Sequence, residues 1–175
     1  TILTELMPCS LYQVLEDDIH RLSLPEILDV ATDVAAGLDY LHSHSPAIVH
    51  RDISSKNILL GGNRAKIADL GQAKIFGSSS SVLSRQTSLP GAMAYSAPEV
   101  LTGKYSAKID IFSFGVLLAQ MASGEYPRID RREEQMFNAS TKHASLETLV
   151  TKSMSYQPEE RPTARDIYSA LTALR

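Results

Sequence analysis

The chain has 175 residues, of which 43% are hydrophobic and 21% are charged, and its formal net charge is −3. These values are ordinary for one globular domain, and the negative charge gives no reason to expect a nucleic-acid partner. Cys9 is the only cysteine, which excludes an internal disulfide and a cysteine metal cluster and fits a reducing compartment. The apolar stretch 111–122 is too short to cross a bilayer, so we expect a buried helix there and no membrane segment in this chain.

The first residues, 1–7, are apolar enough for a short strand, which Pro8 would end. They contain neither an initiator methionine nor a basic, signal-like start, so they resemble the interior of a longer chain. Residues 24–42 then repeat apolar side chains at helical spacing, with Ser23 as N-cap and Glu26 in the first turn. This pattern predicts a helix over 24–42.

Short apolar bursts replace the helical pattern between residues 46 and 74, and Gly61-Gly62-Asn63 separates the last two bursts. That separation predicts a small hairpin. Residues 77–90 are rich in serine and predict a mobile surface loop. Further helices are predicted at 109–121, at 146–154 and, capped by Thr163, at 163–174, whereas 124–141 receives no assignment.

Four short motifs follow one another along the chain. They are His50-Arg51-Asp52 with Asn57 five residues after the aspartate, Asp69-Leu70-Gly71, Ala97-Pro98-Glu99, and the helix start at Asp110. Taken alone, the first triplet is equally consistent with a solvated surface pair followed by a turn asparagine. In this order and spacing, the motifs resemble the protein kinase superfamily, and residues 48–57 are most similar to its tyrosine-kinase-like and receptor-like branches.

The resemblance implies an α+β protein kinase-like fold. Residues 1–175 would form a partial kinase domain, consisting of the hinge and a mainly α-helical C-terminal lobe with small β-hairpins, while the N-terminal lobe is largely missing. The implied activity is transfer of the γ-phosphate of ATP to a protein hydroxyl, with Mg²⁺ or, alternatively, Mn²⁺. Asp52 would orient the hydroxyl and accept its proton, Lys56 would assist, and Asn57 and Asp69 would hold the metal through oxygen.

The resemblance also implies structural roles for His50, Leu70, Gly71, Glu99, Asp110 and Arg161. Leu70 stands where the family usually has Phe, and we expect it to pack as an apolar plug against His50. Gly71 would give the backbone freedom to present Asp69. Glu99 would pair with Arg161 in a buried ion pair, and Asp110 would brace the backbone of the catalytic loop.

Residues 1–7 would supply the last N-lobe strand and the hinge, with Thr4 at the gatekeeper position. Nucleotide contacts are implied for the backbone of Glu5 and Met7, for Ser10 near the ribose, and for Leu59 beneath the adenine ring. Arg51, directly before the catalytic aspartate, marks kinases whose activation loop is ordered by phosphate. Thr87 and Ser88 are the favoured acceptors for an upstream activating kinase.

The acceptor specificity is less strongly indicated. Ser54 stands where serine/threonine kinases usually carry lysine, Lys56 follows two residues later, and Ala92 replaces a threonine of the substrate-docking loop. We favour serine/threonine specificity, with a tyrosine or dual-specificity kinase as the alternative. A small-molecule phosphotransferase is disfavoured by Ala97-Pro98-Glu99 and Arg161, which are typical of kinases that act on proteins.

Elements expected of a complete kinase are absent before Thr1, namely a glycine-rich loop, the lysine of V-A-I-K and a glutamate to pair with it. We therefore expect this polypeptide alone to be inactive, and a non-catalytic pseudokinase or scaffold remains the alternative function. The implied location is the cytoplasm, or the cytoplasmic part of a membrane receptor.

Overall fold

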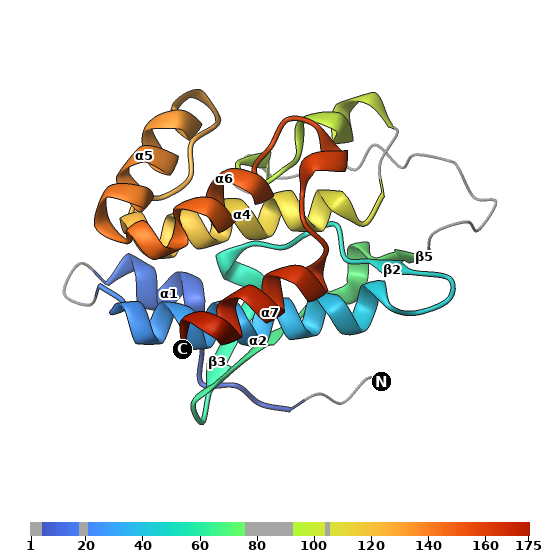
Figure 1. Ribbon diagram of the computed structural model, residues 1–175. Helices are drawn as coiled ribbons and strands as arrows, with labels where there is room; N and C mark the ends of the chain where they lie inside the picture. Colours follow the sequence, from blue (N-terminus) through green and yellow to red (C-terminus); the bar gives the residue numbers. More distant parts are fainter. Residues whose placement is uncertain (1–4, 18–20, 76–92, 104–105) are drawn as a thin grey trace.

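The computed structural model describes residues 5–17, 21–75, 93–103 and 106–175. This part of the chain is mainly helical, with two small antiparallel sheets (Figure 1). Its helices are α1 (Leu11–Glu16), α2 (Leu24–His42), α4 (Lys108–Ser123), α5 (Arg132–Lys142), α6 (Glu147–Ser153) and α7 (Ala164–Leu174). Its strands are β1 (Cys9–Ser10), β2 (Ile48–Val49), β3 (Ile58–Gly61), β4 (Arg64–Ile67) and β5 (Lys74–Ile75).

The helix α2 matches the predicted bounds. Its start is stabilised by Glu26, whose carboxylate accepts hydrogen bonds from the Ser23 backbone N–H at 2.8 Å and the Ser23 hydroxyl at 2.6 Å. Its buried side chains pack against α7, β4 and α4, and α7 lies along α2 in Figure 1. The predicted C-terminal helix is also confirmed, because the Thr163 hydroxyl caps α7 by accepting from the Asp166 backbone N–H at 3.2 Å.

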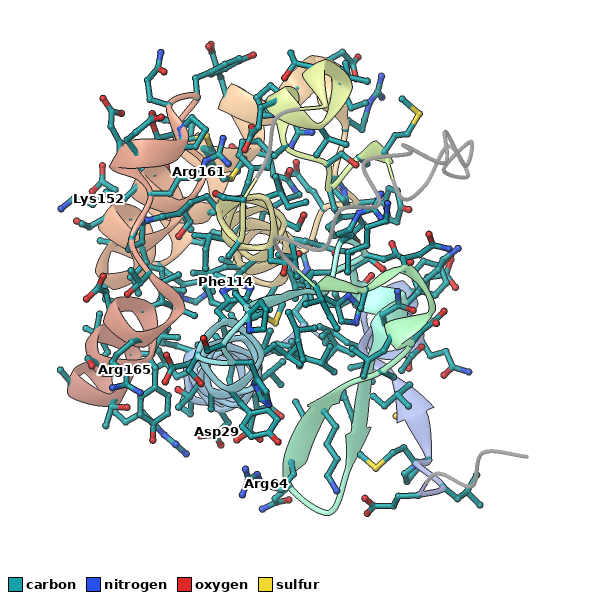
Figure 2. All side chains as sticks on the ribbon, turned by 90° about the vertical axis from the view of Figure 1, so that its right-hand side faces the viewer. Asp29, Arg64, Phe114, Lys152, Arg161 and Arg165 are labelled. Carbon is teal, nitrogen blue, oxygen red and sulfur yellow. The ribbon has the colours of Figure 1, made fainter. Side chains whose placement is uncertain are left out.

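The helix α4 runs through the centre of the lobe and is buried on every side from Ile109 to Ser123. Phe114, at the middle of α4, is fully buried, and it is labelled in the interior of the molecule in Figure 2. Gly115 permits close packing, since a Cβ there would lie 2.7 Å from the side chain of Met154. The prediction of a buried helix is therefore confirmed, and no helix in the described ranges is long and apolar enough to cross a membrane.

The two sheets place the loops that matter for function. β3 pairs with β4 in the predicted hairpin, whose turn residues Gly62 and Asn63 have φ values of 57° and 61°. β1 pairs with the other edge of β3, and β2 pairs with β5 in the second sheet. The sheets thus bring together segments that precede and follow the predicted catalytic motifs.

Several predicted elements differ from the structure. Residues 5–7 form no strand, and the first strand is β1; Thr1–Thr4 lie outside the described residues, as does the predicted loop 77–90. The prediction missed α1, which has only six residues and therefore less than two helical turns of pattern. It also missed α5, whose mean hydropathy is low because much of its surface is charged or polar, so its buried stripe is narrow.

Candidate active site

Asp110, at the start of α4, holds the backbone of the loop that follows β2. Its carboxylate accepts hydrogen bonds from the backbone N–H groups of His50 and Arg51, both at 2.8 Å. The His42 Nε2 lies 2.9 Å from the same carboxylate, which is 1% exposed. A buried carboxylate with these partners is a rigid anchor, because each of its bonds replaces one lost to water.

The anchor coincides with unusual backbone geometry. Arg51 has a φ of 71°, in the left-handed region that costs non-glycine residues about 1 kcal/mol or more. The two hydrogen bonds to Asp110 come from the N–H groups of Arg51 and of the residue before it, and they hold the loop in that conformation. The Arg51 side chain reaches the Gln72 carbonyl, with its Nη1 at 3.4 Å.

The buried ring of His50 joins the two loops that carry the predicted site. Its Nδ1 lies 3.3 Å from the Asp52 backbone N–H, which can only donate. Its Nε2 lies 3.0 Å from the Ala68 carbonyl, which can only accept. The ring therefore carries a proton on Nε2 and spans from the Asp52 loop to the Asp69 loop.

Asn57 fixes the carboxylate of Asp52. The Asn57 Nδ2 donates to the Asp52 carbonyl at 2.8 Å and to the Asp52 Oδ2 at 2.9 Å. Within the described ranges, no donor occupies the Asn57 Oδ1 or the second carboxylate oxygen of Asp52. Lys56 is exposed, and its ammonium lies 4.8 Å from the centroid of the Tyr12 ring.

The β3–β4 hairpin explains why Asn57 and Asp69 lie close together despite their separation along the chain. Asn57 immediately precedes β3, Asp69 comes two residues after β4, and Ile58 pairs with Ile67. The Ala68 N–H donates to the Asn57 carbonyl at 2.8 Å, which extends the ladder by one bond. An antiparallel hairpin therefore carries both predicted metal ligands at its open end.

Asp69 has a left-handed φ of 61°, and its Oδ1 accepts from the Gly71 N–H at 3.0 Å. The Gly71 backbone is not left-handed, and a Cβ there would lie 2.8 Å from the Asp69 Oδ1, so a larger residue would displace the Asp69 carboxylate. The expected plug by Leu70 is wrong, since its side chain is 57% exposed. Leu70 starts the short 3₁₀ helix 70–72, which directs it outward while the His50 ring is bonded to Ala68 instead.

The residues predicted to contact the nucleotide lie along the β1–β3–β4 sheet. Ser10 on β1 is paired with Leu59 on β3, which places these two predicted residues side by side. The Ser10 hydroxyl also caps α1, accepting from the Gln13 N–H at 3.3 Å. Met7 lies against Gly61 at the end of β3, and Glu5 forms an exposed ion pair with Lys66 of β4. Thr4 lies outside the described residues.

Glu99 and Arg161 form a bidentate pair, with oxygen–nitrogen distances of 2.6 Å and 2.9 Å. Arg161 is 1% exposed and donates further bonds to the carbonyls of Ser155 at 2.8 Å and Lys108 at 3.0 Å. This arrangement ties the 3₁₀ helix Pro98–Thr102, which contains Glu99, to the segment that precedes α7.

A second arginine, which sequence reasoning missed, docks α5 onto the same region. The Arg132 guanidinium lies 4.9 Å from the Phe112 ring centroid, and Arg161 lies 4.8 Å from it. The Arg132 Nη2 donates to the Ser96 carbonyl at 3.1 Å, and burial lowers the pKa of Arg132. Its position in the unassigned segment 124–141 gave no local signal for this contact.

The donor set at the hairpin end suits a hard cation that also binds phosphate. Asn57 and Asp69 offer an amide oxygen and a carboxylate, which are oxygen ligands of the kind that Mg²⁺ prefers. The part of the chain that is described contains no group of three or more His, Cys, Asp or Glu side chains able to hold a metal alone. This pair thus fits Mg²⁺ shared with substrate phosphates. Thr87 and Ser88, the predicted phosphorylation sites, lie outside the described residues.

The sequence profile of the protein kinase domain matches residues 1–171. The chain therefore belongs to the protein kinase family, which confirms the predicted superfamily and the α+β, mainly helical fold.

Individual relatives agree with this assignment. The dual specificity protein kinase shkC of Dictyostelium discoideum is 34% identical over 185 residues, which cover 97% of this chain and 36% of that protein. The LRR receptor-like serine/threonine-protein kinase FEI 2 of Arabidopsis thaliana is 33% identical over 190 residues, which cover 93% of this chain and 32% of that protein. The serine/threonine-protein kinase TNNI3K of Mus musculus is 38% identical over 121 residues, which cover 67% of this chain and 14% of that protein. The matched segment thus covers at most 36% of the length of these three relatives.

Proposed function

We propose that residues 1–175 supply the acid/base and metal-binding half of a protein kinase site, in a larger protein that transfers the γ-phosphate of ATP to serine or threonine hydroxyls. The observation that supports this most is the convergence of Asp52, Asn57 and Asp69. Asn57 bonds Asp52 directly, and the hairpin carries Asn57 and Asp69 at one end. A scaffold without catalysis has no chemical need for this arrangement.

In this mechanism, Asp52 receives the acceptor hydroxyl. The Asn57 amide occupies the Asp52 Oδ2, which leaves the other carboxylate oxygen to orient the hydroxyl and take its proton. Because the Asn57 Nδ2 points toward Asp52 in this bond, the Asn57 Oδ1 points away from Asp52. Mg²⁺, or Mn²⁺ in its place, would be held by Asn57 and Asp69 and would neutralise charge on the phosphates.

The serine/threonine assignment rests on the sequence of the catalytic and docking loops and on the names of two relatives, which are both serine/threonine-protein kinases. Dual specificity is the second candidate, because one relative of similar identity carries that name. Lys56 supports the first candidate less than its sequence position suggests, since its ammonium lies over the Tyr12 ring. Phosphoamino-acid analysis of the products separates the two.

The activity is tested with the full-length protein, ATP, Mg²⁺ and a degenerate peptide library with serine, threonine and tyrosine acceptors. We expect phosphate transfer that requires the metal and that falls by at least about a thousandfold in Asp52→Asn. Residues 1–175 alone should show no transfer. Equal activity in wild type and Asp52→Asn would refute the proposed role of Asp52, and an inactive full-length protein would favour the scaffold.

A further inference from the structure

A hydrogen-bonded bridge of three buried side chains lies beneath the catalytic loop. Ser55 belongs to the loop itself, Tyr95 lies three residues before the 3₁₀ helix Pro98–Thr102, and Gln120 is on α4. These residues are 0%, 3% and 3% exposed, so their polar groups need protein partners in place of water. The phosphoryl-transfer chemistry described above uses none of the three.

The direction of the hydrogen bonds follows from the number of protons available. The Tyr95 hydroxyl donates to the Gln120 Oε1 at 2.6 Å. Because a phenol has a single proton, the Ser55 hydroxyl donates to the Tyr95 oxygen, 2.9 Å away. Burial raises the pKa of Tyr95 to about 12, so the phenol keeps this proton at physiological pH. Each hydrogen bond of the bridge is therefore donated toward α4: Ser55 donates to Tyr95, and Tyr95 donates to Gln120.

Tyr95 is held by more than its hydroxyl. Its carbonyl accepts from the Ser113 hydroxyl at 2.9 Å, and Ser113 lies two turns before Gln120 on α4. Its ring makes an edge contact with Tyr126, with centroids 6.5 Å apart. Backbone, ring and hydroxyl are thus all attached to the central helix or its continuation, which makes Tyr95 a fixed point for Ser55.

The position of Ser55 decides what the bridge can do. Ser55 starts the 3₁₀ turn Ser55–Asn57, and Asn57 at its other end bonds both the carbonyl and the carboxylate of Asp52. A shift of Ser55 is therefore transmitted to Asp52 through Asn57. We propose that the Ser55–Tyr95–Gln120 bridge positions the catalytic loop relative to the substrate-docking segment around Tyr95, and so sets where Asp52 meets the acceptor hydroxyl. This inference rests on the proposed kinase activity.

The test uses the full-length protein and the best acceptor peptide from the library. We expect Tyr95→Phe and Ser55→Ala each to lower kcat on the order of tenfold, equivalent to about 1.4 kcal/mol in the barrier. The KM for ATP should stay within about twofold, since neither side chain lies along the β1–β3–β4 sheet. The double variant should be no worse than the less active single variant, because both changes break one bridge.

Tyr126→Phe is the matched control. It removes the same hydroxyl from a tyrosine that touches the Tyr95 ring, but Tyr126 is 46% exposed and lies outside the bridge. Its kcat should remain near that of the wild type. All variants are assayed well below their own melting temperatures, so that a loss of folded protein is not counted as a loss of rate.

A Tyr95→Phe protein with a lower melting temperature but wild-type kcat would show that the bridge only stabilises the fold, and the proposal would fail. Losses that multiply in the double variant would equally exclude a single connected bridge. If Tyr95→Phe does not fold, Ser55→Ala decides, and wild-type kcat in that variant refutes the bridge. If the wild type is active and Asp52→Asn is inactive, such a result refutes the bridge alone and leaves the proposed kinase function standing. An inactive wild type overturns both proposals.

Discussion

Replacing Glu99 with alanine removes the carboxylate that pairs with the buried guanidinium of Arg161. The side chain of Arg161 is fully buried and that of Glu99 is 14% exposed, so water cannot readily replace the lost partner. Breaking a buried pair by removing one member costs roughly 3–5 kcal/mol, because it leaves an uncompensated charge. The carbonyls of Ser155 and Lys108 still accept from the guanidinium, which places the expected loss toward the lower end of that range.

This loss translates into a large change in melting temperature. A protein of 150–250 residues loses about 2–4 °C for each kcal/mol, so a loss of roughly 3 kcal/mol, the lower end of the range, corresponds to a drop of about 6–12 °C in Glu99→Ala. Thermal unfolding followed by circular dichroism measures the drop, and urea unfolding gives the free energy separately. Glu99→Gln should lose less, because its amide oxygen still accepts one hydrogen bond.

An exposed arginine pair in the same lobe provides the control. Arg165 on α7 bonds Asp39 at 3.1 Å, but its side chain is 73% exposed, and Figure 2 shows it on the outer side of the molecule. Exposed pairs contribute about 0–1 kcal/mol, so Arg165→Met should shift the melting temperature by no more than about 4 °C. If Glu99→Ala destabilises the protein no more than Arg165→Met does, the assumption that burial makes the Glu99–Arg161 pair costly to break is wrong.

Three further predictions concern the loops and the C-terminal helix. Asp110→Ala leaves two backbone N–H groups without their partner, so we expect a loss of about 2–6 kcal/mol in unfolding free energy and a fall in kcat, measured by urea unfolding and peptide phosphorylation. Gly71→Ala pushes the Asp69 carboxylate aside, so the Mg²⁺ concentration for half-maximal activity should rise. The melting temperature of the protein should change little, because residue 71 is exposed. The Thr163 hydroxyl lowers the pKa of Asp166 below 3.8; its stabilisation is therefore present above that pH and lost as the pH falls through the lowered pKa. The stability difference between wild type and Asp166→Asn should accordingly shrink below about pH 4 in pH-dependent thermal melts.

Local patterns were sufficient for much of the fold. Apolar periodicity and a capping residue indicate the helices α2 and α7, and both are found at the predicted bounds within one residue. The hairpin was predictable for the same reason, because Gly62 and Asn63 supply the left-handed turn between two short apolar strands. Strands of four residues and a two-residue turn account for most of the spacing between Asn57 and Asp69. The proximity of these two residues therefore follows from the hairpin pattern in the sequence alone.

Long-range polar partners could not be predicted in this way. His42 meets Asp110 across 68 positions, and Ser55 meets Tyr95 across 40, although neither histidine nor serine has a local pattern that identifies its partner. Leu70 was misjudged because the family resemblance supplied a role for the side chain, whereas the 3₁₀ turn that follows Asp69 directs it outward. For the His42 and Ser55 contacts, the outcome depends on how segments far apart in the sequence pack against α4 and one another, which no local window contains.

The polar residues of α4 nevertheless carry a signal that can be read from sequence. A helix that is apolar on every side is expected to be fully buried, so each polar side chain in it must bond to something other than water. Asp110 bonds the catalytic-loop backbone, Ser113 bonds the Tyr95 carbonyl, and Gln120 bonds the Tyr95 hydroxyl. Each of these three interruptions of the apolar pattern thus corresponds to one attachment of a functional loop. It follows that apolar substitutions at these three positions should retain the helix while releasing the loops, and that activity should be more sensitive to them than helix content is.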